Sequence, residues 1–344
     1  MRAAILVEQN RPLELAELQL PALDYGQVLV RLRYSGICGS QLGEIEGVKG
    51  PDPYLPHLLG HEGTGVVQDV GPGVRRVRPG DPVVLHWRQA EGIQAAPPRY
   101  RWGSRQVNAG WVTTFNDEAV VSENRLTPLP PDVDLETAAL YGCALTTGFG
   151  VIHHDARVSL GESVVVYGVG GVGLAVVLGA SLAGACPVVA VDLFPHKLEA
   201  ARAQGATHTV LAGPEAPARI REIVGAGGAD VVVDNTGRPE VIEEAWKLTA
   251  AQGRTILVGV TRHDQPIRID PMPLHFGKVM TGSHGGSSVP SRDIPRYLRL
   301  QKAGRFDLSG FVSHRYPLER VNEALEAMRR GEVIRCTLTM EETA

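Results

Sequence analysis

The chain has 344 residues, a length typical of about two domains and sufficient to bury a sizeable core. Apolar residues make up 43% and charged residues 21%, which is ordinary for a folded globular protein and excludes global disorder. The 34 basic and 38 acidic side chains give a formal net charge of −4 without a long basic run, so nucleic acid binding has no electrostatic support. Four dispersed cysteines without CxxC spacing exclude a disulfide framework, and the apolar run near the N-terminus is too short for a signal peptide. We therefore expect a cytoplasmic protein.

The first part of the chain, up to about residue 150, is predicted to be rich in β-strands. Short apolar or alternating runs, separated by Gly, Pro and Asp, predict strands at 3–7, 27–34, 63–70 and 81–87. Residues 86–114 are aromatic, basic and proline-containing, and their three tryptophans predict a long ordered loop rather than a disordered linker.

From about residue 160 the pattern changes to strands that alternate with helices. Strands are predicted at 163–168, 187–192, 208–211, 229–237 and 254–260, and helices at 174–184, 197–206, 218–225 and 239–249. This alternation predicts βαβ units and a parallel sheet, because parallel strands need crossover connections. The last part returns to a mixed pattern, with amphipathic helices at 294–304 and 318–331 and a closing strand at 334–340.

Residues 163–191 contain no charged side chain, and by length alone this stretch could span a bilayer. However, it holds a glycine cluster at 168–173 and Pro187 near its end. A buried strand, a glycine turn, a buried helix and a second buried strand explain it better, so we expect no contact with a membrane.

A nucleotide-binding loop is predicted at 168–173, where Gly168, Gly170, Gly171 and Gly173 match GxGxxG. The motif follows a predicted strand and opens a predicted helix, so its backbone N–H groups can approach a pyrophosphate. Asp192 ends the next strand, 19 residues after Gly173, where a carboxylate accepts hydrogen bonds from the ribose of NAD and repels the 2′-phosphate of NADP. The alternative interpretation of this motif is a glycine-rich packing turn.

Cys38, His61 and Cys143 are candidate metal ligands, and each lies in a glycine-rich segment. Two thiolates and one imidazole, with an open fourth position, are typical of a tetrahedral catalytic zinc site. Taken singly, each of these residues also fits a buried structural role, since free cysteine behaves as a small hydrophobic residue.

Taken together, the segments GICGS, GHEGTGVV, GDPVV, GCALTTGFG, GVGGVG, VDLFPHK, DNTG, ILVGV and GEVIRCTLTM resemble the zinc-containing alcohol dehydrogenases of the medium-chain dehydrogenase/reductase (MDR) family. The resemblance runs nearly end to end. It implies an α/β fold with a GroES-like β-rich catalytic domain at 1–146 and 288–344 and a Rossmann NAD-binding domain at 147–287. It also implies an oxidoreductase that transfers hydride between an alcohol and NAD.

The same resemblance assigns roles to individual residues. It makes Cys38, His61 and Cys143 the ligands of one catalytic zinc ion per chain, and Glu62 a carboxylate near the zinc that coordinates it transiently. Ser40 matches the hydroxyl residue that takes the substrate proton. Cofactor contacts are implied for Gly168, Gly170, Gly171, Val172, Gly173, Asp192, Lys197, Thr147, Val258, Val260 and Arg335, the last toward the pyrophosphate. Trp87 falls where the family often places an aromatic wall of the substrate pocket, although Trp87, Val258 and Val260 also fit plain core positions.

Three departures from the family pattern matter. Residues 86–114 contain no cysteine, so we predict no structural zinc. Gln41 stands where the family usually has Asp, and a neutral amide is expected to leave the zinc more electrophilic. Gly43 stands where some members have a histidine that passes the proton to solvent, so the relay beyond Ser40 stays open.

The substrate is predicted only as a primary or secondary alcohol, with a polar alcohol, polyol or sugar favoured. The alternative is an S-(hydroxymethyl)thiol adduct of formaldehyde, whose anionic carrier needs cations such as Arg88, Arg99, Arg101 and Arg105. Polar Gln89, Asn108 and Asn116 fit the first substrate class equally well. Two other functions remain open: a zinc-free quinone or enoyl reductase, and a non-enzymatic NAD(H) sensor. The family resemblance further implies a homodimer or homotetramer with a small-molecule alcohol or carbonyl as partner.

Overall fold

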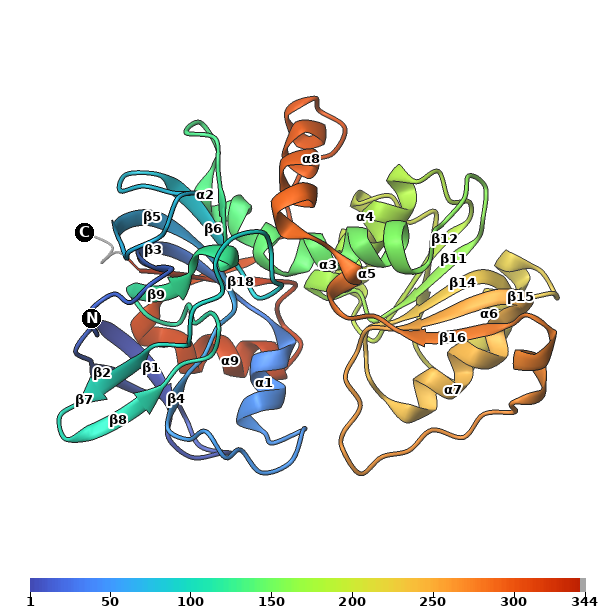
Figure 1. The fold of residues 1–344 in the computed structure, drawn as a ribbon. Coiled ribbons are helices and arrows are strands. Elements are labelled where there is room, and N and C mark those ends of the chain that lie inside the picture. The colour runs from blue at the N-terminus through green and yellow to red at the C-terminus, as the bar shows by residue number, and fades with distance from the viewer. Residues whose placement is uncertain (341–344) are drawn as a thin grey trace. The chain divides into compact units, whose positions relative to one another are not determined.

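The computed structural model describes residues 1–340, and its internal contacts divide the chain into two compact units (Figure 1). Unit 1 consists of Met1–Cys143, Val289–Ala303 and the residues from Val312 on. Unit 2 consists of Ala144–Ser288 and Gly304–Phe311. Unit 1 contains two sheets and unit 2 contains one, and each unit has its own buried apolar cluster.

Unit 1 contains a seven-stranded sheet in which most neighbouring strands are antiparallel. Its order is β10-β6-β5-β3-β18-β17, and β9 also pairs with β3. The strands are β3 (Gln27–Ile37), β5 (Glu62–Val70), β6 (Pro82–His86), β9 (Glu118–Ser122), β10 (Leu126–Pro128), β17 (His314–Pro317) and β18 (Cys336–Thr339). Cys336 pairs with Ile37, so the strand that comes last in the chain completes a sheet begun by the early strand β3.

A second sheet of unit 1 has five strands in the order β2-β1-β4-β8-β7. They are β1 (Arg2–Leu6), β2 (Glu14–Glu17), β4 (His57–Leu58), β7 (Arg99–Trp102) and β8 (Arg105–Asn108). Gln19, just after β2, exchanges two backbone hydrogen bonds with Arg101 of β7, so the two ends of this sheet meet.

The segment 86–114 therefore differs from the predicted loop, because β7 and β8 form a hairpin within it. Buried Tyr100 lies between exposed Arg99 and Arg101 in β7, which is the period of a half-buried strand, and Val107 is buried in β8. Gly103 has a φ of 58° in the two-residue turn, a conformation that glycine adopts without a steric penalty. The Arg-Tyr-Arg-Trp alternation followed by Gly-Ser was the signal that predicts this hairpin.

Apart from α8, the helices of unit 1 are short, and several of them contact its sheets. Helices α2 and η2 contact β5, α8 contacts β10, and α9 contacts α1, β17 and β18. Their bounds are α1 (Gly39–Ile45), η1 (Glu123–Arg125), α2 (Leu135–Ala138), η2 (Ala139–Gly142), α8 (Pro290–Lys302), η6 (Leu318–Arg320) and α9 (Val321–Arg329).

Unit 2 contains a six-stranded, wholly parallel sheet in the order β13-β12-β11-β14-β15-β16. This is the strand order of a Rossmann fold, so the predicted fold class is confirmed. The strands are β11 (Val164–Tyr167), β12 (Val188–Asp192), β13 (His208–Leu211), β14 (Ala229–Asp234), β15 (Thr249–Leu257) and β16 (Val279–Gly282). The first, second and fourth of these are buried valine-rich runs, as expected for strands covered on both faces.

Helices cover both faces of this sheet, with α4 and α5 on one face and α6 and α7 on the other (Figure 1). The predicted helices correspond to α4 (Gly171–Leu182), α5 (Pro195–Ala203), α6 (Ala216–Val224) and α7 (Pro239–Leu248). The remaining helical segments are α3 (Ala144–Gly150), η3 (Val151–Asp155), η4 (Met272–Phe276) and η5 (Gly285–Ser287). Helix α4 is buried almost all round, which explains why residues 163–191 carry no charge.

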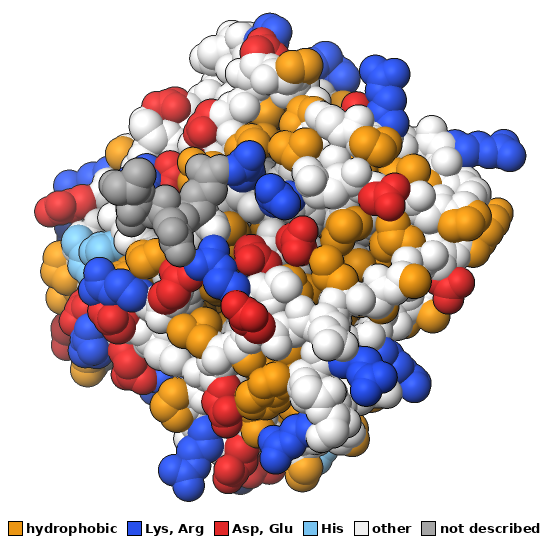
Figure 2. All heavy atoms as spheres, turned by 90° about the vertical axis from the view of Figure 1, so that its left-hand side faces the viewer, with side chains coloured by type: hydrophobic (Ala, Val, Ile, Leu, Met, Phe, Trp, Pro, Cys, Tyr) orange, Lys and Arg blue, Asp and Glu red, His pale blue; other side chains and the backbone are white. Residues whose placement is uncertain are grey.

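No single helix within residues 1–340 is long and apolar enough to cross a membrane. Leu135–Gly142 and Ala144–Asp155 reach that length and composition only as a bent pair. On the face shown in Figure 2, acidic and basic side chains are interspersed among apolar ones.

Candidate functional site

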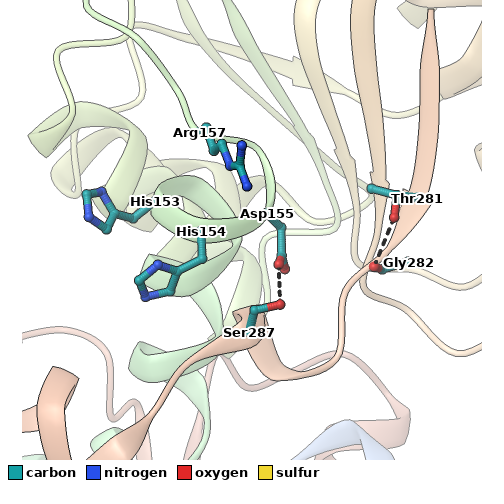
Figure 3. Close-up of a pocket in the computed structure, with 7 residues that line it drawn as sticks. All are labelled: His153, His154, Asp155, Arg157, Thr281, Gly282 and Ser287. Atoms are coloured by element: carbon teal, nitrogen blue, oxygen red, sulfur yellow. Dashed lines mark hydrogen bonds between the residues drawn. The ribbon is translucent and has the colours of Figure 1, made fainter.

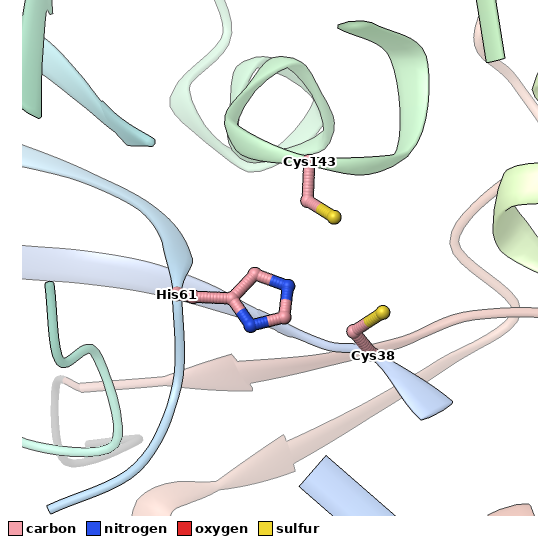
Figure 4. Close-up of side chains that lie close together, drawn as sticks. All are labelled: Cys38, His61 and Cys143. Carbon is pink, nitrogen blue, oxygen red and sulfur yellow. The ribbon is translucent and has the colours of Figure 1, made fainter. Parts of the chain in front are cut away.

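The candidate metal ligands come from three separate segments of unit 1. Cys38 directly follows β3 and is the N-cap residue of α1, while His61 directly precedes β5. Cys143 follows η2. One possible ligand atom from each residue lies within 4.8 Å of the others, and both sulfur atoms and the imidazole face a common space (Figure 4). The structure therefore brings together the three residues that the sequence analysis proposed as zinc ligands.

The chemistry of this donor set fits a metal ion. The hydrogen bond with the Cys143 sulfur holds the pKa of the Cys38 thiol well below its ordinary value and outweighs the opposing effect of burial. Nearby His61 and Arg335 act in the same direction. The Nε2 atom of His61 is buried and has no hydrogen-bond partner among the described residues. A thiolate-forming cysteine and an unused imidazole nitrogen are what a zinc ion requires of its ligands.

Gln41 lies beside this centre and is 1% exposed. Its Oε1 accepts a hydrogen bond of 3.0 Å from the backbone N–H of Cys38. Its Nε2 lies 2.6 Å from Nδ1 of His61 and 3.3 Å from the hydroxyl oxygen of Ser40. Cys38 and Gln41 are the N-cap and N3 residues of α1, the spacing of a capping box, so the helix start fixes the amide next to the ligands.

Glu62 and Arg335 form a buried ion pair in unit 1, with side chains 0% and 3% exposed. Glu62 opens β5, and its side chain fits a slot beside two glycines. A Cβ atom on Gly36 would lie 2.0 Å from Oε1 of Glu62, and one on Gly142 would lie 2.7 Å from its Cβ. The Glu62 carboxylate thus contacts Arg335, and the group of three possible ligands does not include it. Sequence reasoning named both residues but missed that they pair.

Trp87 lies next to the metal centre, with its ring edge-on to His61 at 6.4 Å between centroids. A cavity of about 970 Å³ in unit 1 reaches Gln41 and His61. Lys49, Arg99, Asn108 and Trp111 are among its lining residues. The other predicted cations have different surroundings, since Arg88 lies over Trp87, Arg105 lies over Trp102, and Arg101 is in β7.

The nucleotide-binding loop of unit 2 joins β11 to α4. Gly168 has a φ of 78°, and a Cβ on Gly173 would lie 1.9 Å from the carbonyl oxygen of Gly168. A Cβ on Gly170, the N-cap of α4, would meet nothing within 4 Å, so the backbone is open to a ligand. Asp192 ends β12, and its carboxylate accepts hydrogen bonds from the backbone N–H groups of Val169 and Phe194 at 2.8 and 3.1 Å. This arrangement fits the pyrophosphate and ribose of a dinucleotide.

The other predicted cofactor residues of unit 2 vary in exposure. Thr147 is buried in α3, whereas Val172 and Val258 are half-buried and Val260 is 60% exposed. Lys197 lies 4.7 Å above the ring of Phe194. Sequence reasoning assigned no role to Asp234, whose buried carboxylate accepts hydrogen bonds from Thr236 and Gly237 and shapes the turn after β14. Burial raises the pKa of this carboxyl group.

A second hollow in unit 2, of about 590 Å³, lies apart from the glycine loop (Figure 3). Asp155 accepts a hydrogen bond of 2.6 Å from Ser287 there, while His153 and His154 point away from Thr281. Since these side chains do not converge on one point, the hollow is not a candidate catalytic site.

Comparison with known proteins agrees with this geometry. Residues 24–131 match the family model for the alcohol dehydrogenase GroES-like domain, and residues 171–303 match that for zinc-binding dehydrogenases. The NDMA-dependent alcohol dehydrogenase of Amycolatopsis methanolica is 33% identical over 363 residues, covering 97% of each chain. The S-(hydroxymethyl)glutathione dehydrogenase of Haemophilus influenzae is 31% identical, covering 98% of this chain and 96% of the relative.

Solved structures give the same result. An alcohol dehydrogenase zinc-binding domain protein from Burkholderia ambifaria has a TM-score of 0.90 at 28% identity, covering 99% of each chain. Benzyl alcohol dehydrogenase from Acinetobacter calcoaceticus has a TM-score of 0.88 at 27% identity, again covering 99% of each chain. The chain therefore belongs to the zinc-type alcohol dehydrogenases of the medium-chain family. The predicted family and its oxidoreductase activity are thus confirmed.

Proposed function

We propose that the chain is a zinc- and NAD-dependent alcohol dehydrogenase that acts in the cytoplasm. The observation that carries this proposal is the convergence of Cys38, His61 and Cys143 in one unit, with an unused imidazole nitrogen facing two sulfur atoms. When bound, zinc supplies a Lewis acid that lowers the pKa of an alcohol, and NAD supplies the hydride acceptor.

The chain's own residues hold these groups and handle the proton. Cys38, His61 and Cys143 hold the metal, with Glu62 as a further carboxylate that coordinates it transiently. Ser40 accepts the hydroxyl proton, and Gln41 lies within 3.3 Å of its oxygen. Trp87 forms a wall of the substrate pocket beside His61.

NAD is proposed to bind along the carboxyl edge of the parallel sheet. The glycine loop approaches the pyrophosphate, together with Arg335, and Asp192 and Lys197 contact the ribose. Asp192 is already held against the loop through Val169 N–H, which supports a preference for NAD over NADP. Thr147, Val172, Val258 and Val260 pack around the nicotinamide.

The substrate is proposed to be a polar alcohol. The cavity that reaches His61 has a mixed lining, with cationic Lys49 and Arg99 beside Trp111. An S-(hydroxymethyl)thiol adduct is the second candidate, supported by these same cations and by the name of the Haemophilus influenzae relative.

We also propose that the chain forms a homodimer or homotetramer and binds neither nucleic acid nor membrane. In the described part of the chain, β16 ends the sheet of unit 2 with β15 as its only strand partner. Apolar side chains near this edge are exposed, including Met272, Phe276 and Val279 at 59%, 69% and 44%. An unpaired edge with apolar neighbours favours strand pairing between two copies.

The deciding experiment is the metal content per chain of freshly purified protein, measured by elemental mass spectrometry. One zinc per chain, with NAD reduction on a panel of alcohols, supports the proposal. No metal after control for loss during purification favours a zinc-free reductase or an NAD(H) sensor instead. Two zinc ions per chain contradict the prediction that residues 86–114 bind none.

A further inference from the structure

Gln41 has a buried side-chain amide that contacts two of the candidate metal ligands, the backbone of Cys38 and the imidazole of His61. Its Oε1 accepts from the backbone N–H of Cys38 at 3.0 Å, and its Nε2 lies 2.6 Å from Nδ1 of His61. A side-chain amide has one acceptor oxygen and one donor nitrogen, so it cannot accept from both neighbours.

Both ends of Gln41 are satisfied in one state of His61 only. The backbone N–H of Cys38 is always a donor and occupies Oε1. Nδ1 of His61 must therefore accept from Nε2 of Gln41, which places the proton of the neutral imidazole on its Nε2 atom. This arrangement satisfies both ends of the Gln41 amide while the site holds no metal.

Metal binding demands the opposite tautomer. Nε2 is the ring nitrogen of His61 that faces the two sulfur atoms, and a ligand nitrogen must give up its proton (Figure 4). The proton then lies on Nδ1, where it faces an N–H group of Gln41 instead of an acceptor. Rotation of the amide by 180° does not help, because Nε2 would then face the N–H of Cys38.

We infer that Gln41 is a positioning residue that stabilises the metal-free tautomer of His61 and thereby weakens the hold of the site on zinc. The inference rests on the metal centre proposed above. Its consequence is a chain whose zinc exchanges with its surroundings more readily than the ligand set alone implies.

The first test is the tautomer of His61 in the zinc-free protein. Nitrogen NMR of histidine-labelled protein, with His61 assigned from the spectrum of His61→Asn, distinguishes a protonated Nε2 from a protonated Nδ1. We expect the proton on Nε2 in the wild type and on Nδ1 in Gln41→Glu. A proton on Nδ1 in the wild type overturns the inference, and this result needs no variant of Gln41 to fold.

The second test is zinc affinity, measured by competition with a chelator. Gln41→Glu has the same shape and accepts from both neighbours, so we expect at least about tenfold tighter zinc binding. Glutamate also adds negative charge, and Gln41→Met controls for this because it removes the amide without adding a charge. In Gln41→Met the backbone N–H of Cys38 loses its acceptor in both the metal-free and the metal-bound form. This loss therefore cancels in the free energy of zinc binding.

Gln41→Met is therefore expected to bind zinc about fivefold tighter than the wild type, because the hydrogen bond that favours the metal-free form is lost. An unchanged or weaker affinity in Gln41→Met overturns the inference and makes Gln41 an ordinary supporting residue. Failure of the wild type to bind zinc at any concentration contradicts the proposed function instead, so the two failures are distinguishable.

Discussion

Breaking the buried ion pair between Glu62 and Arg335 is expected to destabilise unit 1 strongly. Both side chains are at most 3% exposed, so removing either partner leaves the other charge in a region with little solvent. Breaking such a pair costs about 3–5 kcal/mol of unfolding free energy. For a unit of this size, that loss lowers the melting temperature by about 6–20 °C.

The test is a double-mutant cycle with Glu62→Gln, Arg335→Met and the double variant. Each single variant is expected to lose about 3–5 kcal/mol, whereas the double variant carries no uncompensated charge at these positions. The double variant should therefore lose about 2–3 kcal/mol less than the sum of the two single losses. Glutamine at position 62 has the same shape as the Glu62 side chain that fits beside Gly36 and Gly142, so Glu62→Gln removes the charge without changing the packing.

Urea unfolding of zinc-free protein, followed by tryptophan fluorescence, measures these losses. Three of the four tryptophans, Trp87, Trp102 and Trp111, lie in unit 1, so the signal mainly reports this unit. Single losses below about 1 kcal/mol, or losses that add in the double variant, would refute the reasoning.

Three further predictions follow from other contacts. Cys38→Ser or Cys143→Ser is expected to lose bound zinc and turnover but to keep NAD binding, because the cofactor loop belongs to unit 2. Elemental analysis measures the zinc, and calorimetric titration measures NAD binding. Turnover that is retained without metal contradicts this prediction. Asp192→Ser should lower the ratio of kcat/KM for NAD to that for NADP by about tenfold, equivalent to about 1.4 kcal/mol, and an unchanged ratio argues against the ribose role. Glu123→Gln should lose about 1–3 kcal/mol at pH 7, because the Glu123 carboxylate accepts three backbone N–H groups. Burial raises the pKa of Glu123, but these hydrogen bonds outweigh burial and lower the pKa from its ordinary value of 4.5. The stabilisation by Glu123 is therefore present above pH 4.5 and is lost as the pH falls through the lowered pKa. Equal urea midpoints of Glu123→Gln and the wild type at pH 7 would contradict this prediction.

The parallel sheet of unit 2 was predictable from the sequence because three of its strands, β11, β12 and β14, are valine-rich runs. Burial on both faces leaves no room for polar side chains in β11, and the glycine loop that follows has a recognisable local spacing. The hairpin at β7 and β8 was not predicted, since only one face of it is buried and its arginines resemble those of a surface loop.

The metal centre was predictable only in part. Its ligands are 23 and 82 residues apart along the chain, so no local periodicity joins them and the resemblance to a family was needed. Pairwise contacts such as Glu62 with Arg335, or Gln41 with His61, depend on side-chain directions that a sequence pattern does not contain. The roles of the individual site residues stay predictions.

Strand β18 pairs with β3, although the whole of unit 2 lies between them in the chain. During synthesis, unit 2 can therefore fold as soon as its own strands have emerged, while the larger sheet of unit 1 waits for its last strand. Until Cys336–Thr339 arrives, one side of β3 near Ile37 has no strand beside it, and Arg335 has not yet reached Glu62. A nascent chain thus holds Cys38 and Cys143 before the sheet that supports them is complete, so their thiols can meet oxidants and stray metals at this stage.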